Sequence, residues 1–320
     1  MKVLITGATG LVGRALVEEL KDKNIPVHYL TTSRAKIVSK TGYQGYYWDP
    51  SSGEIDPAAF EGVTAIINLA GATISKRWTS SYKKIVLDSR LDSLKTLYRG
   101  LVAFGPERIS SFVSASAIGI YPHSYTTFYA EGETAVDDSF LGEVVKAWED
   151  HINRFKDLNC SVAKIRIGLV LSDQGGALPK IAGPINNYAG AAFGSGQQWQ
   201  SWIHIKDLAR LFVYTVEKQL KGTFNGVAPN PVTNSKLTKE VAKALKKPLF
   251  LPNIPKVFMN TILGEMAYLL FASQRVSSKR IEKKGFHFEY KNICSALESF
   301  YGEADCSKES DLTTYEKNFS

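Results

Sequence analysis

The sequence predicts an α/β protein built on a doubly wound, mostly parallel sheet, with a smaller and mostly helical C-terminal cap. Short apolar runs alternate with helical patterns over the first 230 residues. The runs are apolar on both sides, which is typical of parallel strands covered by helices on both faces. A glycine-rich turn joins the first run to the first helix. The 320 residues, of which 44% are hydrophobic, can bury a substantial core without disulfides or metal ions.

The alternation is clearest in the first half of the chain. The run at residues 2–6 ends in the glycine-rich turn, and residues 11–20 carry apolar side chains at helical spacing. Pro26 separates this helix from the next strand, and Gly105-Pro106 ends a long helical pattern that starts at residue 80. The predicted strands are residues 2–6, 27–30, 45–48, 65–69, 111–114 and 162–171, and the predicted helices are 11–20, 80–104 and 140–158.

The pattern changes after residue 171. Residues 172–200 are rich in Gly, Ala and Gln and are expected to form an active-site loop with a short helix. A helix at 205–216, a strand at 224–227 and a helix at 236–246 follow, and the apolar run 262–272 predicts a buried helix. We therefore divide the chain into a main domain at 1–230, a cap at 231–300 and a polar tail at 301–320 that is expected to be disordered.

Charge and cysteine content restrict the possible ligands. The net charge of +8 suits a phosphate-bearing ligand, a nucleic acid or an anionic membrane surface. The Lys and Arg residues are scattered, so a small anionic ligand is favoured, and no nucleic acid or membrane partner is predicted. The three cysteines are far apart, without metal or redox spacing, so no metal site and a reduced, cytoplasmic setting are expected. Monomer and homodimer both remain open.

The glycine-rich turn is the most specific motif in the chain. Gly7, Gly10 and Gly13 form a G-x-x-G-x-x-G pattern directly between a strand and a helix. Gly7 permits the tight turn, Gly10 lets a pyrophosphate approach the backbone, and Gly13 lets helix and strand pack closely. The first turn of the helix offers unpaired N–H groups to phosphates. We predict dinucleotide binding here, with Thr9, Leu11 and Val12 also in contact, rather than a turn without a ligand.

The end of the second strand predicts which nicotinamide cofactor binds. NAD sites usually carry Asp or Glu there, to hold the ribose hydroxyls. This chain has no acid at that place and instead reads Thr31-Thr32-Ser33-Arg34. Arg34 and Ser33 can bind a 2′-phosphate through charge-assisted hydrogen bonds, so NADP(H) is predicted over NAD(H). A solvated Arg34 without a ligand is the alternative. Asp49 either reaches the adenine or caps the turn at Pro50.

A set of motifs resembles a known family. The chain is similar, over residues 1–298, to atypical, extended short-chain dehydrogenase/reductases grouped as NAD-dependent or sugar-nucleotide epimerases, which are sometimes labelled cell-division inhibitor-like. The motifs include Asn68-Leu69-Ala70-Gly71, Arg77-Trp78-Thr79, Ser89-Arg90, residues 114–119, Trp148-Glu149, Arg166-Ile167-Gly168, residues 175–178, residues 202–205, Asp207, residues 225–229 and residues 264–266. The resemblance implies a Rossmann fold and its cofactor more firmly than it implies a reaction.

Further cofactor contacts are expected at the carboxyl ends of the strands, where ligands of such sheets gather. Leu69, Ala70 and Gly71 end the fourth strand, and Ser114 ends the fifth. Arg166 either meets an anion of the substrate or cofactor, or is paired with a buried carboxylate.

The expected catalytic set is incomplete. The wider superfamily uses Ser or Thr with Tyr-x-x-x-Lys, in which the Lys holds the nicotinamide ribose and lowers the pKa of the Tyr. Ser116 and Lys146 match two of these positions, but Gly142 stands where the Tyr belongs. Tyr121 is the nearest substitute for proton transfer, or else packs under its loop. Tyr125 and Tyr129 are further candidates, and His204 is expected to make a structural hydrogen bond rather than to transfer protons.

These observations support one leading function and two alternatives. We expect an NADP(H)-dependent oxidoreductase or epimerase that acts on a small, polar, sugar-like substrate, with Ser116 polarising a carbonyl or hydroxyl. The main alternative, favoured by Gly142, is a regulatory or interaction protein that binds NADP(H) without turnover. An RNA-binding Rossmann protein is the third hypothesis, and it would require a continuous basic face.

Overall fold

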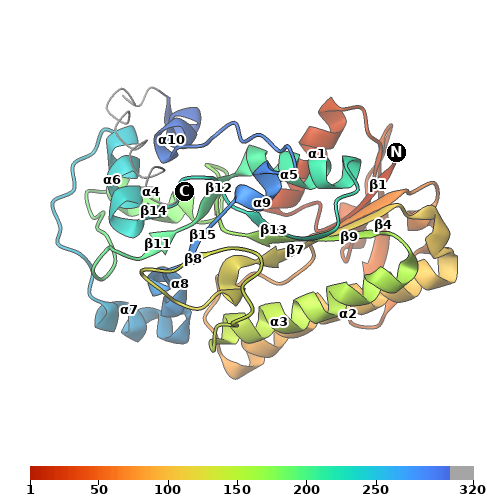
Figure 1. Cartoon of the computed structure of the whole chain (residues 1–320), viewed down its shortest axis with the longest axis horizontal. Coiled ribbons are helices and arrows are strands. Elements are labelled where there is room, and N and C mark those ends of the chain that lie inside the picture. The colour runs from red at the N-terminus through yellow and green to blue at the C-terminus, as the bar shows by residue number, and fades with distance from the viewer. Residues whose placement is uncertain (303–320) are drawn as a thin grey trace.

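A nine-stranded sheet forms the centre of the molecule in the computed structural model, which describes residues 1–302 (Figure 1). The strand order is β13-β9-β7-β6-β1-β2-β4-β3, and β5 pairs with β4. All pairs are parallel except those of β3 and β5 with β4. The strands are β1 Val3–Thr6, β2 Val27–Thr31, β3 Ser39–Lys40, β4 Tyr43–Asp49, β5 Glu54–Ile55, β6 Ala65–Asn68, β7 Ser111–Ala117, β9 Ser161–Ile167 and β13 Gly222–Gly226. The predicted doubly wound α/β fold is confirmed.

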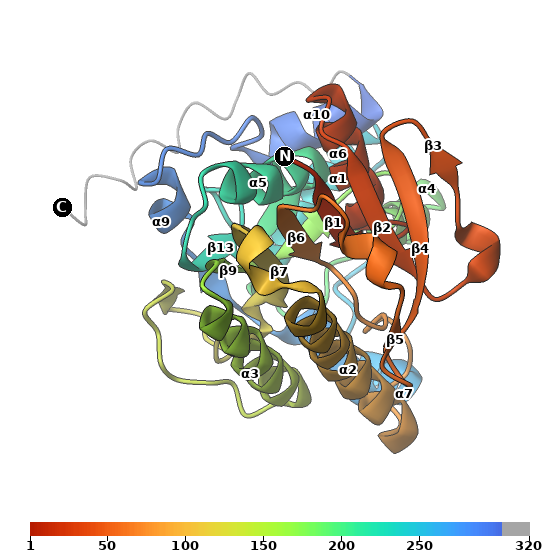
Figure 2. The same cartoon turned by 90° about the vertical axis from the view of Figure 1, so that its right-hand side faces the viewer.

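Helices cover both faces of this sheet. Helices α1 (Leu11–Asp22) and α5 (Ile205–Glu217) pack on one face, and α2 (Ser80–Phe104) and α3 (Phe140–Asn153) pack on the other (Figure 2). The bounds of α2 agree with the prediction because both ends carry local signals. The Thr79 hydroxyl accepts a hydrogen bond from the Tyr82 N–H, and Gly105 ends the helix with a φ of 113°. The chain continues from α3 into the 3₁₀ segment Arg154–Leu158.

The predicted strand at 162–171 is two strands. Strand β9 ends at Ile167, and β10 (Leu169–Leu171) leaves the main sheet to pair with β12 (Trp202–His204). Gly168 lies at the change of direction, where a Cβ atom would be 2.2 Å from the Ser201 carbonyl oxygen. The close approach of the two backbones at Gly168 therefore starts the second, smaller part of the molecule.

The cap is assembled from segments on both sides of residue 230. Its core combines Leu171, Leu178 and Trp202 with later residues such as Leu237 and Leu297. Conversely, Ile281, Phe286 and Phe288 belong to the core of the main sheet. The remaining elements are β8 Phe128–Tyr129, α4 Leu178–Asn186, β11 Trp199–Gln200, β14 Val232–Thr233, α6 Asn234–Ala244, α7 Lys256–Leu263, α8 Tyr268–Phe271, β15 Arg275–Val276, α9 Lys279–Glu282 and α10 Ile293–Tyr301.

The prediction of one buried helix over residues 262–272 is wrong. Gly264 adopts a φ of 59°, which ends α7, and a 3₁₀ segment then leads into the short helix α8. Ile262 remains 51% exposed. Most of the predicted tail lies outside the described residues, except that Tyr301 is the last residue of α10. Within residues 1–302, no helix has the length and hydropathy that crossing a membrane requires.

The aromatic pair under α3 generates a prediction for stability. Phe112 of β7 and Phe155 are fully buried and stack with their ring centroids 3.8 Å apart. We expect Phe112→Ala to lower the free energy of unfolding by about 3–5 kcal/mol, through lost burial and a cavity. Phe258→Ala is the matched control, because Phe258 is 57% exposed, and it should change stability by less than about 0.5 kcal/mol. Equal midpoints of urea denaturation for the two variants would contradict the assignment of this core.

Candidate functional site

The glycine-rich turn between β1 and α1 has the geometry of a phosphate site. Gly7 adopts a φ of 72°, and a Cβ atom at Gly13 would lie 2.2 Å from the Gly7 carbonyl oxygen. Gly10 precedes α1 with extended backbone, gives the helix no side-chain cap, and is followed by no acid in the first turn. The N–H groups of Leu11, Val12 and Gly13 therefore face the turn without a capping side chain, as an anion requires.

A row of buried polar side chains forms the floor beside this turn. The Thr6 hydroxyl accepts hydrogen bonds from the N–H groups of Leu69 and Ala70, both at 3.0 Å, and donates one to Asn68. The Asn68 amide donates to the Ser114 hydroxyl at 3.0 Å. These bonds fix the path of residues 69–71 at the carboxyl end of β6. Ser114 itself is fully buried, so its contribution to the site is to hold this floor.

The loop after β2 carries Arg34, a cation that packs against an aromatic ring. Arg34 is exposed, and its guanidinium lies 3.8 Å from the centroid of the Tyr47 ring on β4. Its nearest carboxylate is Glu54, at 3.8 Å, in an exposed pair that contributes little. Ser33 is half-buried beside it, and its N–H donates to the Thr31 hydroxyl. Asp49 caps the turn, because it accepts hydrogen bonds from the N–H and hydroxyl of Ser51.

A buried ion pair lies at the carboxyl ends of β7 and β9. Arg166 donates to Glu149 through Nε at 2.8 Å and through a terminal nitrogen at 3.0 Å. Lys164 donates to the same carboxylate at 3.0 Å. Burial alone would raise the pKa of Glu149, but the charges of Arg166 and Lys164 outweigh it and hold that pKa below its usual value. The structure thus shows Arg166 tied to a buried carboxylate, which is one of the two alternatives expected from the sequence.

Two of the expected catalytic hydroxyls belong to this network. Ser116, which is 2% exposed, donates its proton to Glu149 at 2.7 Å. Tyr121 is fully buried; its hydroxyl donates to the Asn225 side chain at 2.8 Å and accepts a hydrogen bond from Arg166 at 2.9 Å. Burial raises the pKa of Tyr121, although Arg166 opposes this effect. The Tyr121 hydroxyl is therefore protonated and fully engaged, as expected for an aromatic side chain that packs under its loop.

Helix α3 explains the missing tyrosine. A Cβ atom at Gly142 would lie 2.0 Å from the Asp137 carbonyl oxygen, so this backbone admits no side chain there. The carboxylate of Asp137 accepts hydrogen bonds from the N–H groups of His123 and Ser139 and from the Tyr268 hydroxyl. Lys146 lies on the exposed side of α3, and its side chain makes no hydrogen bond to any residue in the described range.

The loop 172–200 and the cap contribute two groups, Gly176 and Arg275, to which the sequence assigned no individual role. Gly176 lies against Leu11, so this loop borders the glycine-rich turn. Arg275 of β15 lies between the rings of Phe128 and Trp199, at 5.0 and 4.6 Å. Its buried Nε has no hydrogen-bond partner among the described residues. The sequence signals for this group are the motif Ser273-Gln274-Arg275-Val276, which belongs to the family resemblance, and Trp199, which with Gln197 and Gln198 is a candidate substrate contact on the glycine-rich loop.

His204 and Asp207 have structural roles. The Nδ1 atom of His204 accepts a hydrogen bond from the Lys206 N–H and caps α5, while Nε2 contacts the Ser299 hydroxyl at 3.0 Å. Burial, with a smaller effect of Lys206, lowers the pKa of His204 to about 3. Asp207 accepts hydrogen bonds from the N–H groups of Glu289 and Tyr290 and so holds the segment before α10.

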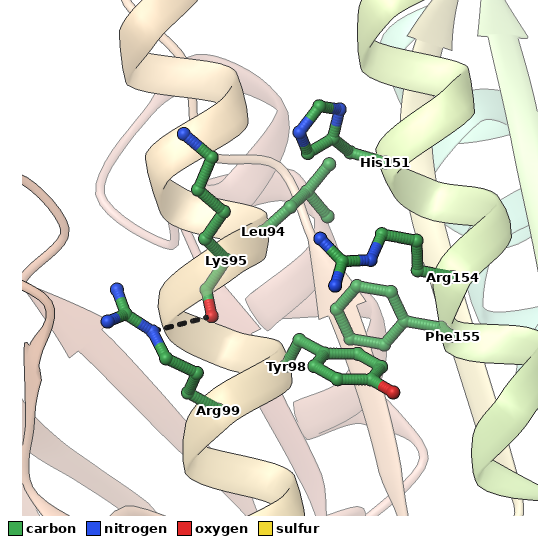
Figure 3. A pocket seen from close by; sticks show the side chains of 7 residues that line it. All are labelled: Leu94, Lys95, Tyr98, Arg99, His151, Arg154 and Phe155. Carbon is green, nitrogen blue, oxygen red and sulfur yellow. Dashed lines mark hydrogen bonds between the residues drawn. The ribbon is translucent and has the colours of Figure 1, made fainter.

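A cavity of about 250 Å³ lies between α2 and α3, away from these residues (Figure 3). It is lined by Leu94, Lys95, Tyr98, Arg99, His151, Arg154 and Phe155. Both helices begin after the carboxyl end of a parallel strand, so their later turns lie toward the amino ends. The cavity therefore contains none of the residues expected from the sequence. Within residues 1–302, no cluster of His, Cys, Asp and Glu could hold a metal ion.

The fold and the glycine-rich turn together define a protein with the NAD(P)-binding fold of short-chain dehydrogenase/reductases. The chain belongs to the NAD dependent epimerase/dehydratase family, whose model matches residues 3–140. Residues 254–300 match a second family model, described as a domain of unknown function (DUF1731). An epimerase family protein of Staphylococcus epidermidis is 36% identical over 302 residues, which cover 93% of this chain and 98% of that protein. The resemblance expected from the sequence motifs is confirmed.

Two solved structures are also similar. The human epimerase family protein SDR39U1, crystallised with NADPH, superposes with a TM-score of 0.82 at 27% identity, covering 94% of this chain and 99% of that one. The nucleoside-diphosphate sugar epimerase of Corynebacterium glutamicum superposes with a TM-score of 0.76 at 29% identity. It covers all of this chain, which spans 62% of that longer protein.

The contact at Gly142 predicts the effect of adding one methyl group. Gly142→Ala should lower the free energy of unfolding by about 1–3 kcal/mol, because α3 must move away from Asp137. Gly132→Ala is the control, because nothing lies within 4 Å of a Cβ atom there. Its effect should stay within about 0.5 kcal/mol in the same urea titration. An unchanged stability of Gly142→Ala would mean that the absent tyrosine has no steric cause.

The buried His204 predicts a pH dependence. Its pKa is lowered from 6.5 to about 3 in the folded protein. As the pH falls, His204 is therefore protonated at a higher pH in the unfolded chain than in the folded protein. Stability from this group is complete above pH 6.5 and is lost progressively toward pH 3, by about 1.4 kcal/mol per pH unit at most. His204→Phe keeps a ring between Tyr290 and Phe300 and should show a shallower slope in urea denaturation across this range. Parallel slopes would contradict the low pKa.

Proposed function

We propose that this protein binds NADP(H) and acts as an oxidoreductase or epimerase on a small, polar, sugar-like substrate. The observation that carries the cofactor assignment is Arg34, a cation 3.8 Å from the centre of the Tyr47 ring, just after a strand that lacks the acid of an NAD site. A ribose 2′-phosphate is a better partner for Arg34 than the exposed Glu54 carboxylate, because it carries more charge and more acceptor oxygens. NADPH in the human relative supports the same assignment.

The residues of the turn fit the rest of this cofactor. The uncapped N-terminus of α1 suits a pyrophosphate. Residues 69–71 follow the carboxyl end of β6, the strand beside β1. NADP(H) would supply or accept a hydride at C4 of its nicotinamide ring. Lys146, on the first half of α3, is proposed to reach the nicotinamide ribose from its exposed position.

The role proposed for Ser116 follows from its hydrogen bond. The single hydroxyl proton of Ser116 is donated to Glu149, so the lone pairs of its oxygen remain for a substrate group. This arrangement suits a substrate hydroxyl that donates to Ser116 better than a carbonyl that needs a donor. Sugar-like substrates offer such hydroxyls, and the epimerase of Corynebacterium glutamicum is named for a nucleoside-diphosphate sugar. Arg275, between two aromatic rings, would meet an anionic part of such a substrate.

A second function is favoured by one specific observation. The backbone at Gly142 excludes the usual tyrosine, and the hydroxyl of Tyr121 is already engaged by Asn225 and Arg166. A protein that binds NADP(H) without turnover would need neither hydroxyl. Tight NADPH binding without NADPH oxidation over a panel of sugar nucleotides and carbonyl compounds would favour this alternative.

The cofactor assignment is tested by titrating the protein with NADPH and with NADH, followed by calorimetry. Arg34→Ala should weaken NADPH binding about ten-fold or more, through the loss of a charged hydrogen bond, and leave NADH binding unchanged. Arg108→Ala, which removes another exposed arginine that lies over an aromatic ring, is the control and should change neither. Equal losses for both cofactors in Arg34→Ala would overturn the role of Arg34. Failure of the unaltered protein to bind either cofactor would overturn the proposed function.

A further inference from the structure

The largest accumulation of exposed apolar side chains lies between α6 and α8. Phe250 is 70% exposed, Leu251 52%, Val257 77%, Phe258 57% and Ile262 51%. We call these five residues the 250–262 patch. None of the eight residues of α7 is buried in the described structure, although five of its side chains are large and apolar. Several large apolar side chains that are exposed within 13 residues of one another mark an interaction site more often than isolated exposed residues do.

The patch is ordered by its attachment to the rest of the cap. Ile254 forms backbone hydrogen bonds of 2.8 Å with Ala192 and with Gly194, and the Asn253 side chain donates to the Gly194 carbonyl oxygen at 2.9 Å. The segment from α6 to α7 runs along the outer edge of the molecule (Figure 1). The apolar side chains are therefore exposed to solvent, while hydrogen bonds to Ala192 and Gly194 hold the backbone of this segment in place.

The segment of the chain that carries the patch has one predominant sign of charge. Residues 239–263 contain one acid, Glu240, and five lysines, which are Lys239, Lys243, Lys246, Lys247 and Lys256. Five positive charges minus one negative charge give +4, half of the net charge of the whole chain in 25 residues. Lys246 and Lys256 are exposed and flank the apolar loop directly. An occupant of the patch must therefore be apolar and must also carry negative charge at its rim.

We propose that the 250–262 patch docks this protein onto an anionic lipid surface. Apolar side chains enter the boundary between head groups and acyl chains, while the flanking lysines meet the anionic head groups. A second copy of the chain fits less well, because it would bring lysines against lysines, with Glu240 and Glu265 as the acids nearest in the sequence and Glu265 already paired with Lys83. Docking of this kind needs no helix that spans the membrane, in agreement with the described helices.

The position of the patch gives the docking a consequence for the candidate site. Glu265, just beyond α7, forms an ion pair with Lys83, and Gly264 lies against Arg77. Lys83 is in the first turn of α2, which follows the carboxyl end of β6. The docked face therefore adjoins the edge of the sheet where the glycine-rich turn and Ser116 lie.

Cosedimentation of the full chain with lipid vesicles tests the proposal. One set of vesicles contains phosphatidylcholine alone, and the other is an equimolar mixture of phosphatidylcholine and phosphatidylglycerol. We expect binding to the mixed vesicles and at least about ten-fold weaker binding to the neutral ones. Ile262→Asp should reduce binding to the mixed vesicles by about ten-fold or more. Val102→Asp is the matched control, because Val102 is also 51% exposed but lies near the far end of α2, and it should bind like the unaltered protein.

The lysines are tested separately. Replacing Lys246 and Lys256 with Gln should weaken binding by about five-fold for each lysine near the membrane surface. The same changes at Lys21 and Lys156, which are exposed elsewhere, should have little effect. Equal binding to both kinds of vesicle, or equal losses in Ile262→Asp and Val102→Asp, would overturn the proposal. The absence of vesicle binding would overturn the proposal as well. If the protein instead forms a dimer that Ile262→Asp dissociates, the patch is an interface with a second copy.

Discussion

The arrangement of the candidate site depends on the buried ion pair between Glu149 and Arg166. It joins α3 to β9, and through Ser116 and Tyr121 it also fixes the end of β7 and the loop that follows. Two charges with side chains 7–8% exposed are costly to bury, and here bidentate geometry and Lys164 offset that cost. Loss of one partner would leave an uncompensated charge in the core, typically at a cost of about 3–5 kcal/mol.

The packing of helix α3, which carries Glu149, also limits the chemistry at the site. In a typical enzyme of this superfamily, a tyrosine and a lysine on the same helix share the work of proton transfer. Here the corresponding helix is held so close to Asp137 that position 142 must be glycine, and its inward face carries Glu149 instead. The helix therefore contributes the fixed carboxylate of Glu149 and lacks the tyrosine hydroxyl that transfers a proton in the typical enzyme. A reaction at this site would need a proton donor other than a tyrosine at position 142.

Much of the main sheet could be predicted from the sequence, because its signals are local. Apolar runs, the glycine turn and the caps of α2 each involve neighbouring residues, so the strands and helices that depend on them agree with the structure. The breaks at Gly168 and Gly264 cannot be predicted from the sequence, because each depends on a backbone conformation or a contact that one isolated glycine does not reveal. The partner of Arg166 was also undetermined, since Glu149 reaches it only through packing of α3 on the sheet. The support of Arg34 by Tyr47 has the same origin, because β2 and β4 pair only in the folded sheet.

The interleaved cores restrict how this protein can be divided. A fragment that ends at residue 230 would lack Ile281, Phe286 and Phe288, and it would keep Trp202 and Leu178 without the helices that cover them. Neither half of the chain contains a complete hydrophobic core. The protein should therefore melt as one cooperative unit, and in evolution the two parts can be inherited together far more easily than exchanged as modules.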